Sequence, residues 1–152
     1  MSIYIASNAT VVGDVVLGEN VNIWYGAVLR GDSGTITVGD STNIQDNAVL
    51  HEQTQVGKHC TIGHSAIVHG CTVGDNTVIG MGAIVLNGAV IGNNCIVGAG
   101  ALVTGKMNAP DGSVILGNPA KVVKELTPQQ VEDNAHSAAH YVELAQKGLP
   151  VL

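Results

Sequence analysis

An aliphatic residue that recurs every six positions constrains this chain more than any other feature of its sequence. Gly often follows it directly, and a small residue lies four positions after it. The series shifts twice, by a three-residue insertion after Leu29 and by one missing residue after Val68. The seventeen aliphatic positions are Ile5, Val11, Leu17, Ile23, Leu29, Val38, Ile44, Leu50, Val56, Ile62, Val68, Val73, Ile79, Val85, Ile91, Val97 and Val103.

A repeat of this kind predicts a stack of identical coils. Each hexad gives one short strand and one turn, and three hexads close a triangular coil with both repeating positions pointing inward. One coil cannot bury its own core, so we expect a parallel β-helix of between five and six stacked coils. The small inward positions are Ala9, Val15, Val21, Ala27, Ser33, Thr42, Ala48, Thr54, Cys60, Ala66, Thr72, Thr77, Ala83, Ala89, Cys95 and Ala101.

Composition fits this architecture and excludes several others. The 152 residues contain no Phe, 3% aromatic residues and 12% charged residues, so the core must pack small aliphatic side chains. The net charge of −6 argues against a nucleic-acid or anionic-membrane partner. No apolar run is long enough to span a membrane.

The cysteines and the first residues predict a cytoplasmic protein. Met1–Ile5 has neither the basic nor the apolar region of a signal peptide. Cys60, Cys71 and Cys95 form no paired framework, so we expect structural, reduced thiols. Cys60 and Cys95 fall in the small inward position, where a thiol behaves as a small hydrophobic group.

The end of the chain predicts a helix. We expect the β-helix over residues 1–108, a loop and extended segment over 109–126, and a C-terminal helix within 127–152. Thr127-Pro128-Gln129-Gln130 is typical of a capped helix start, and Gly148 would end the helix after Gln146 or Lys147. One side of this helix carries an apolar stripe, which should face the β-helix or a neighbouring subunit. The stripe comprises Val131, Ala135, Ala138, Val142 and Ala145.

The repeat places three residues in one outward column. His51 and His69 follow Leu50 and Val68, which are one coil apart, so the two histidines should be neighbours. Arg30 follows Leu29 one coil earlier. His59, His136 and His140 lack such neighbours, and we expect them to be solvated.

A second column lies on the preceding face. Asp46 and His64 follow Ile44 and Ile62 at equal spacing, and Gln45 lies beside Asp46. Three imidazoles could close on one metal if the columns of two subunits met, which favours a symmetric homotrimer. Three His ligands with an open position are typical of catalytic zinc, with Fe²⁺ or Co²⁺ as alternatives. Asp46 is the candidate carboxylate that orients His64.

These residues resemble the gamma-class carbonic anhydrases and their short bacterial relatives. The likeness covers nearly the whole chain and rests on the runs Asn43–His51, Ile62–Cys71, Ile79–Ala83, Leu29–Asp32 and Gly117–Ala120. It implies a left-handed β-helix and a homotrimer with metal sites between subunits.

The resemblance also implies the chemistry. His51 and His69 of one subunit and His64 of its neighbour would hold zinc, whose bound hydroxide would convert CO₂ to bicarbonate. Gln45 would lie near the bound water, Arg30, Asp32 and Asp46 would form a supporting network, and the helix residue Tyr141 would approach the site.

Two departures from the family pattern lower the expected activity. The acidic loop that carries a proton-shuttle glutamate in the active form is absent, which leaves Glu52 as the only nearby carboxylate. Ser33 replaces the glutamate that follows Arg-Gly-Asp in that form. We therefore expect weak or no CO₂ hydration.

Two alternatives remain open. The same class of β-helix includes acyl-CoA thioesterases and acyltransferases, although only Lys121 and Lys124 could bind the phosphates of CoA. The metal could also hold a non-catalytic trimer together.

Overall fold

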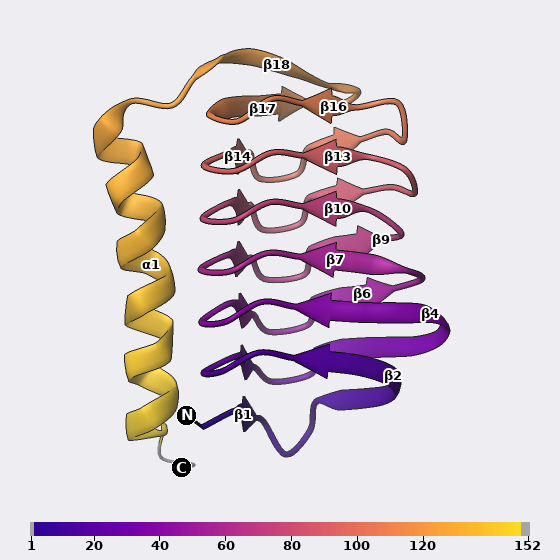
Figure 1. Cartoon of the computed structure of the whole chain (residues 1–152), viewed down its shortest axis with the longest axis vertical. Coiled ribbons are helices and arrows are strands. Elements are labelled where there is room, and N and C mark those ends of the chain that lie inside the picture. Colours follow the sequence, from indigo (N-terminus) through magenta and orange to yellow (C-terminus); the bar gives the residue numbers. More distant parts are fainter. Residues whose placement is uncertain (1, 150–152) are drawn as a thin grey trace.

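The computed structural model describes residues 2–149, which form a β-solenoid of about six turns with one C-terminal helix beside it (Figure 1). This confirms the predicted stack of hexapeptide coils followed by a helix. Its parallel strands are β1 (Tyr4–Ile5), β2 (Thr10–Leu17), β3 (Asn22–Ile23), β4 (Val28–Val38), β5 (Asn43–Ile44), β6 (Val49–His51), β7 (Thr54–Val56), β8 (Thr61–Ile62), β9 (Ile67–His69), β10 (Thr72–Val73), β11 (Val78–Ile79), β12 (Ile84–Val85), β13 (Val90–Ile91), β14 (Ile96–Val97), β15 (Leu102–Val103), β16 (Asn108–Ala109) and β17 (Ser113–Gly117).

The strands form three faces, because successive hexads turn at the corners of a triangle. Face 1 contains β1, β3, β5, β8, β11, β14 and β17. Face 2 contains the first half of β4 with β6, β9, β12 and β15, and face 3 contains its second half with β7, β10, β13 and β16. The long strands β2 and β4 bend around the corner between faces 2 and 3.

The interior consists of the predicted aliphatic residues stacked in register. Leu29, Leu50 and Val68 are one above the other on face 2 and fully buried. Continuous burial of such columns is the main stabilising contribution, at roughly 25 cal/mol for each Å² of apolar surface removed from water. The first coil is the open end of the stack, and Ile5 remains 44% exposed there.

Two predicted inward positions are wrong, and both lie where the repeat is irregular. Ser33 is exposed, and Ile36 fills its place because the four residues from Asp32 to Thr35, opposite Asp14 alone, bulge outward at the corner. Thr72 is also exposed, and Cys71 takes the inward position because the missing residue shortens that corner. All three cysteines are therefore buried and free, as expected for structural thiols.

The parallel pairing extends past residue 108. β16 pairs with β13, and β17 pairs with β14 before the antiparallel strand β18 (Ala120–Glu125) covers the end of face 1. Ala109 and Ile115 continue the six-residue spacing from Val103 and are buried. Ala109 is small, which hides the continuation in a search for large aliphatic residues.

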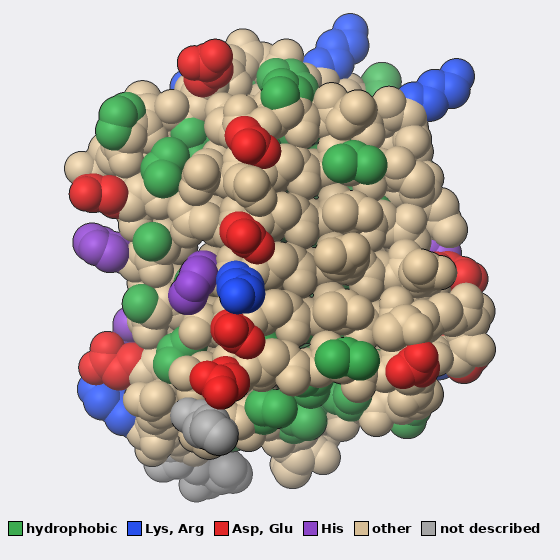
Figure 2. Space-filling model, viewed as in Figure 1, with side chains coloured by type: hydrophobic (Ala, Val, Ile, Leu, Met, Phe, Trp, Pro, Cys, Tyr) green, Lys and Arg blue, Asp and Glu red, His purple; other side chains and the backbone are tan. Residues whose placement is uncertain are grey.

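The corner between faces 3 and 1 carries a ladder of polar side chains. Carboxylates of Asp40, Asp75 and Asp111 each accept a hydrogen bond from a backbone N–H one coil below, at 2.8–2.9 Å. Figure 2 shows acidic side chains aligned along the long axis of a surface that is otherwise mostly uncharged. The aspartates therefore cap the turns of every second coil.

Helix α1 (Pro128–Lys147) lies along face 1, where it contacts β3, β5 and β8 (Figure 1). Thr127 and Gln130 form the predicted reciprocal cap, and Gly148 ends the helix. The predicted stripe is wrong at Ala135, which is exposed. Asn134 takes that place, because its amide donates to the carbonyls of Asn76 and Cys95 at 3.0 and 3.2 Å. Within residues 2–149, we find no helix that has both the length and the apolar character to cross a bilayer.

Candidate metal centre

The first histidine column forms as predicted, at the end of face 2. Arg30, His51 and His69 pair in register on β4, β6 and β9. The rings of His51 and His69 are 5.2 Å apart between centroids and meet edge to face. One coil below and one coil above, the same outward position is occupied by Val12 and Leu86, so the polar column is confined to three coils.

Arg30 and Asp32 position the ring of His51. The guanidinium of Arg30 donates to Asp32 Oδ2 at 2.7 Å, and Asp32 Oδ1 lies 3.1 Å from His51 Nε2. Desolvation acts to raise the pKa of Asp32, but the hydrogen bond from His51, a backbone hydrogen bond and the charge of Arg30 hold it below its ordinary value. Asp32 is therefore an anion that fixes the ring of His51.

The arrangement of the four ring nitrogens fits a bound cation. His51 Nε2 faces the Asp32 carboxylate and His69 Nδ1 faces the amide oxygen of Asn87, so we assign the ring protons to these two atoms. His51 Nδ1 and His69 Nε2 then present lone pairs to one another across 3.2 Å. Two nitrogens bound to one zinc ion at about 2.05 Å with a tetrahedral angle would be about 3.3 Å apart.

The second column also forms, at the corner between faces 1 and 2. His64 Nδ1 lies 3.0 Å from Asp46 Oδ1, one coil below. The His64 side chain is 47% exposed, and its other ring nitrogen is available to a ligand outside the chain. Among the described residues, His64 does not join His51 and His69 in one cluster of ligand atoms. The chain alone thus brings together two of the three predicted imidazoles.

Gln45 is held in place beside this column. It is buried, and its amide donates to Asn43 Oδ1 at 3.0 Å. Asn43 in turn donates to Cys60 O and to Thr61 Oγ1. Sequence reasoning missed Asn43, although its position on the face that the helix covers could have indicated a buried polar partner.

Tyr141 lies near the second column from α1. Its ring packs edge to face on Trp24 at 5.6 Å, and Trp24 also contacts Tyr4 and Tyr25. Burial raises the pKa of Tyr141, and the nearby charge of Asp46 raises it further. Tyr141 is therefore a neutral phenol at physiological pH. The four aromatic residues of the chain form one cluster next to Asp46.

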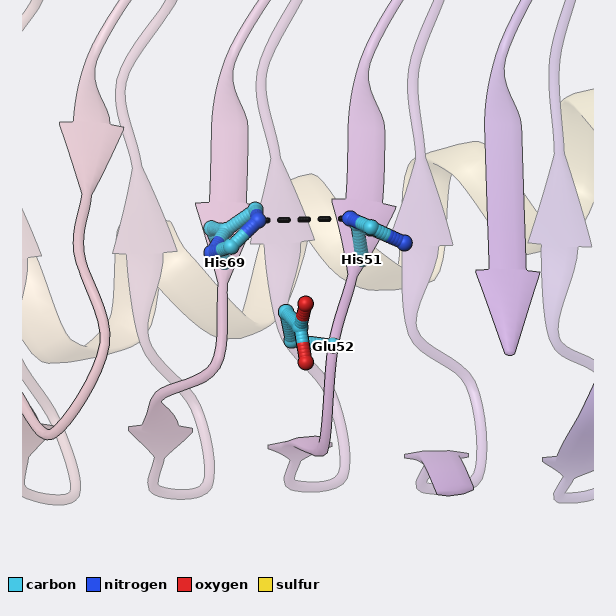
Figure 3. A group of neighbouring side chains, drawn as sticks. All are labelled: His51, Glu52 and His69. Carbon is cyan, nitrogen blue, oxygen red and sulfur yellow. Dashed lines mark hydrogen bonds between the residues drawn. The ribbon is translucent and has the colours of Figure 1, made fainter. Parts of the chain in front are cut away.

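A third potential ligand lies beside the two histidines. The carboxylate of Glu52 and ring nitrogens of His51 and His69 all lie within 4.8 Å of one another, and the three residues are partly buried (Figure 3). Sequence reasoning noted Glu52 only as the nearest carboxylate. It also missed Asn87, although the spacing of 18 residues from His69 places Asn87 in the adjacent coil.

Comparisons with known proteins place the chain in a family. Residues 32–132 match the family model described as the GMPPB C-terminal domain. The chain is 46% identical to a protein of Methanocaldococcus jannaschii named "Probable carbonic anhydrase", over 95% of this chain and 94% of that protein. The chain belongs to the gamma carbonic anhydrase family. It is also 46% identical to the mitochondrial gamma carbonic anhydrase 1 of Arabidopsis thaliana, over 94% of this chain but only 56% of the plant protein.

Solved structures agree with this family assignment at the level of the fold. A hexapeptide transferase family protein from Anaplasma phagocytophilum matches with a TM-score of 0.86 and 41% identity, over 97% of this chain and 93% of that one. The hexapeptide transferase family protein therefore shares the fold of this chain.

Proposed function

We propose that the protein is a metal-dependent carbonic anhydrase that interconverts CO₂ and bicarbonate at a three-histidine site between the subunits of a homotrimer. The observation that carries the proposal is the 3.2 Å approach of His51 Nδ1 to His69 Nε2, while the other ring nitrogen of each histidine faces an oxygen acceptor. Family membership supports the reaction. His51 and His69 would hold zinc together with the partner subunit's His64.

The residues around the histidines have separate positioning roles. Arg30 holds Asp32, which orients His51, and Asn87 orients His69. Asp46 orients the ring of His64. Such partners usually change metal affinity about 10- to 100-fold when they are removed.

Zinc, when bound, lowers the pKa of a coordinated water to about 7 and so supplies a nucleophile at neutral pH. Gln45, fixed by Asn43, would donate or accept a hydrogen bond beside that water. Tyr141 would limit access from the side of the helix. No acidic loop follows His51, since Thr54 already starts the next strand, so we expect slow proton release.

The exposed surface of face 2 supports assembly. Its outward side chains are aliphatic and remain partly exposed, and they lie between the column of His51 and the column of His64. Burial of this stripe against a second copy would bring the two columns together. The stripe comprises Val28, Val49, Ile67, Ile84 and Leu102.

We also propose a cytoplasmic location, because the three cysteines are free and buried, as is usual for a protein kept in a reducing compartment.

The experiment is stopped-flow CO₂ hydration with zinc-loaded and iron-loaded protein. We expect a rate above buffer that the His51→Ala variant loses. A rate equal to that of buffer for both metals, with one metal ion bound per chain, would contradict the enzymatic proposal and leave a metal-stabilised scaffold.

A second function, acyl-CoA hydrolysis or acyl transfer, is supported by the similarity to the hexapeptide transferase family protein. Release of free thiol from a panel of acyl-CoA esters tests it. Thiol release that persists in the His51→Ala variant would favour this second function over CO₂ hydration.

A further inference from the structure

Glu52 has a backbone conformation that its residue type disfavours. Its φ is +63°, and at the same corner the next two coils have glycine, Gly70 at +61° and Gly88 at +87°. A left-handed conformation costs a non-glycine residue about 1–2 kcal/mol. The backbone would accept glycine here at lower cost, as it does in those two coils.

The side chain of Glu52 reaches the two histidines. One carboxylate oxygen and the ring nitrogens of His51 and His69 lie within 4.8 Å of one another, and Figure 3 shows the carboxylate between the ends of the two strands that carry the histidines. Neither the hydrogen bonds nor the ion pairs found among the described residues involve the Glu52 carboxylate. The carboxylate therefore remains available to a cation.

Two imidazoles and one carboxylate are a common ligand set for divalent metal ions. The inner nitrogens of His51 and His69 are already at the separation that a shared ion requires. A small rotation of the Glu52 side chain would bring its oxygen to the same ion, and its negative charge would partly neutralise that ion.

We propose that His51, His69 and Glu52 form a divalent-cation site within a single chain, which loads the metal before a second subunit arrives. The inference rests on the proposed function only in taking His51 and His69 as metal ligands. On assembly, the partner subunit's His64 binds the ion that the chain already holds. Glu52 thus helps to bind the ion in the single chain, and a chain without His64 still binds metal.

The test is a Co²⁺ titration of metal-free protein, followed by the visible absorption of the bound ion and by metal content. We expect the His64→Ala variant to bind one Co²⁺ per chain, and the His64→Ala/Glu52→Gln variant to bind it at least about tenfold more weakly, since removing a ligand should cost at least as much as removing a residue that orients one. The matched control is His64→Ala/Glu132→Gln, which changes an exposed glutamate on α1 and should bind like His64→Ala.

Two results would overturn the inference. One is equal Co²⁺ affinity of the His64→Ala variant and the His64→Ala/Glu52→Gln variant, and the other is no Co²⁺ binding at all by the His64→Ala variant. Circular dichroism of each variant checks that the solenoid is folded. Failure of the proposed function would look different, because wild-type protein would then bind metal without hydrating CO₂.

Discussion

Faces 1 and 2 of the solenoid have short parallel strands with the same spacing, but they differ in the side chains that point outward and in what covers them. Face 1 lies under α1, and its outward polar residues Asn22, Asn43 and Thr61 are buried and hydrogen-bonded. Face 2 presents outward Val, Ile and Leu side chains that stay partly exposed, and histidine columns border it on both sides. Apolar side chains are thus partly exposed on one face while polar ones are covered on the other.

The difference shows that the two faces are suited to different contacts: face 1 to the helix of the same chain, and face 2 to another apolar surface. The helix of the same chain recognises face 1 through specific hydrogen bonds, such as those of Asn134. The outward stripe of face 2 is aliphatic instead, and it would gain most from contact with another apolar surface. On the proposed function, the two columns beside this stripe would each supply part of the metal site, so assembly and metal binding would share one surface.

The largest effect should come from a charge on face 2. The Ile67→Arg variant should weaken subunit association by at least about 100-fold, because an unpaired charge buried at an interface costs about 3–5 kcal/mol. Native mass measured over a concentration series would show the monomer. Thr72→Arg, on exposed face 3, is the matched control and should assemble like wild type.

Removal of a ligand histidine should weaken metal binding while the solenoid still folds. The His69→Ala variant should bind zinc at least about 100-fold more weakly, since even residues that only orient a ligand are worth 10- to 100-fold. Competition with a chromogenic chelator measures this. His59→Ala removes an exposed histidine at another corner and should have no effect. Equal affinity in both variants would exclude the His51–His69 pair as ligands.

A change under the helix should affect stability alone. The Asn134→Ala variant leaves the carbonyls of Asn76 and Cys95 without this donor and should lower the free energy of unfolding by about 1–3 kcal/mol. Urea denaturation measures the loss, and the native mass should be unchanged. A change in oligomeric state would show that face 1 also contributes to assembly.

The last effect is a pH dependence of stability, and it comes from the interior that both faces share. Burial raises the pKa of the Cys60 and Cys71 thiols to about 12. Unfolded thiols lose their protons near pH 8.5, so between pH 8.5 and 12 the native state binds more protons and its stability falls as pH rises, by up to about 1.4 kcal/mol per pH unit for each thiol. Urea midpoints from pH 8 to 11 would reveal this slope, and Cys60→Ala should reduce it.

The regular part of the molecule could be predicted from the sequence, because an inward position repeated in every coil leaves little freedom. The errors at Ser33 and Thr72 occur where the repeat gains or loses residues. At such a corner, the spacing alone does not determine which residue points inward and which points to solvent. Those two irregular corners directly follow Arg30 and His69. The repeat is therefore broken beside the site that it positions.

The candidate site was predictable only in part. Register along the solenoid predicts the His51–His69 and Asp46–His64 pairs, because residues one coil apart must be neighbours. The contacts of Asn87 and Glu52 depend on side-chain direction at a corner, which the six-residue spacing does not determine. The prediction of the apolar stripe on the helix was wrong at Ala135, because the hydrogen-bonding residue Asn134 occupies the buried position that was expected to be apolar.

The most direct test of a site shared between subunits is complementation between two defective chains. Chains with His64→Ala and chains with His69→Ala are mixed after unfolding and refolded together, at a free zinc concentration too low for either variant alone. If one chain supplies His51 and His69 and its neighbour supplies His64, mixed trimers regain one tightly bound zinc ion each. A mixture that binds no more zinc than the average of its two components would contradict the shared site.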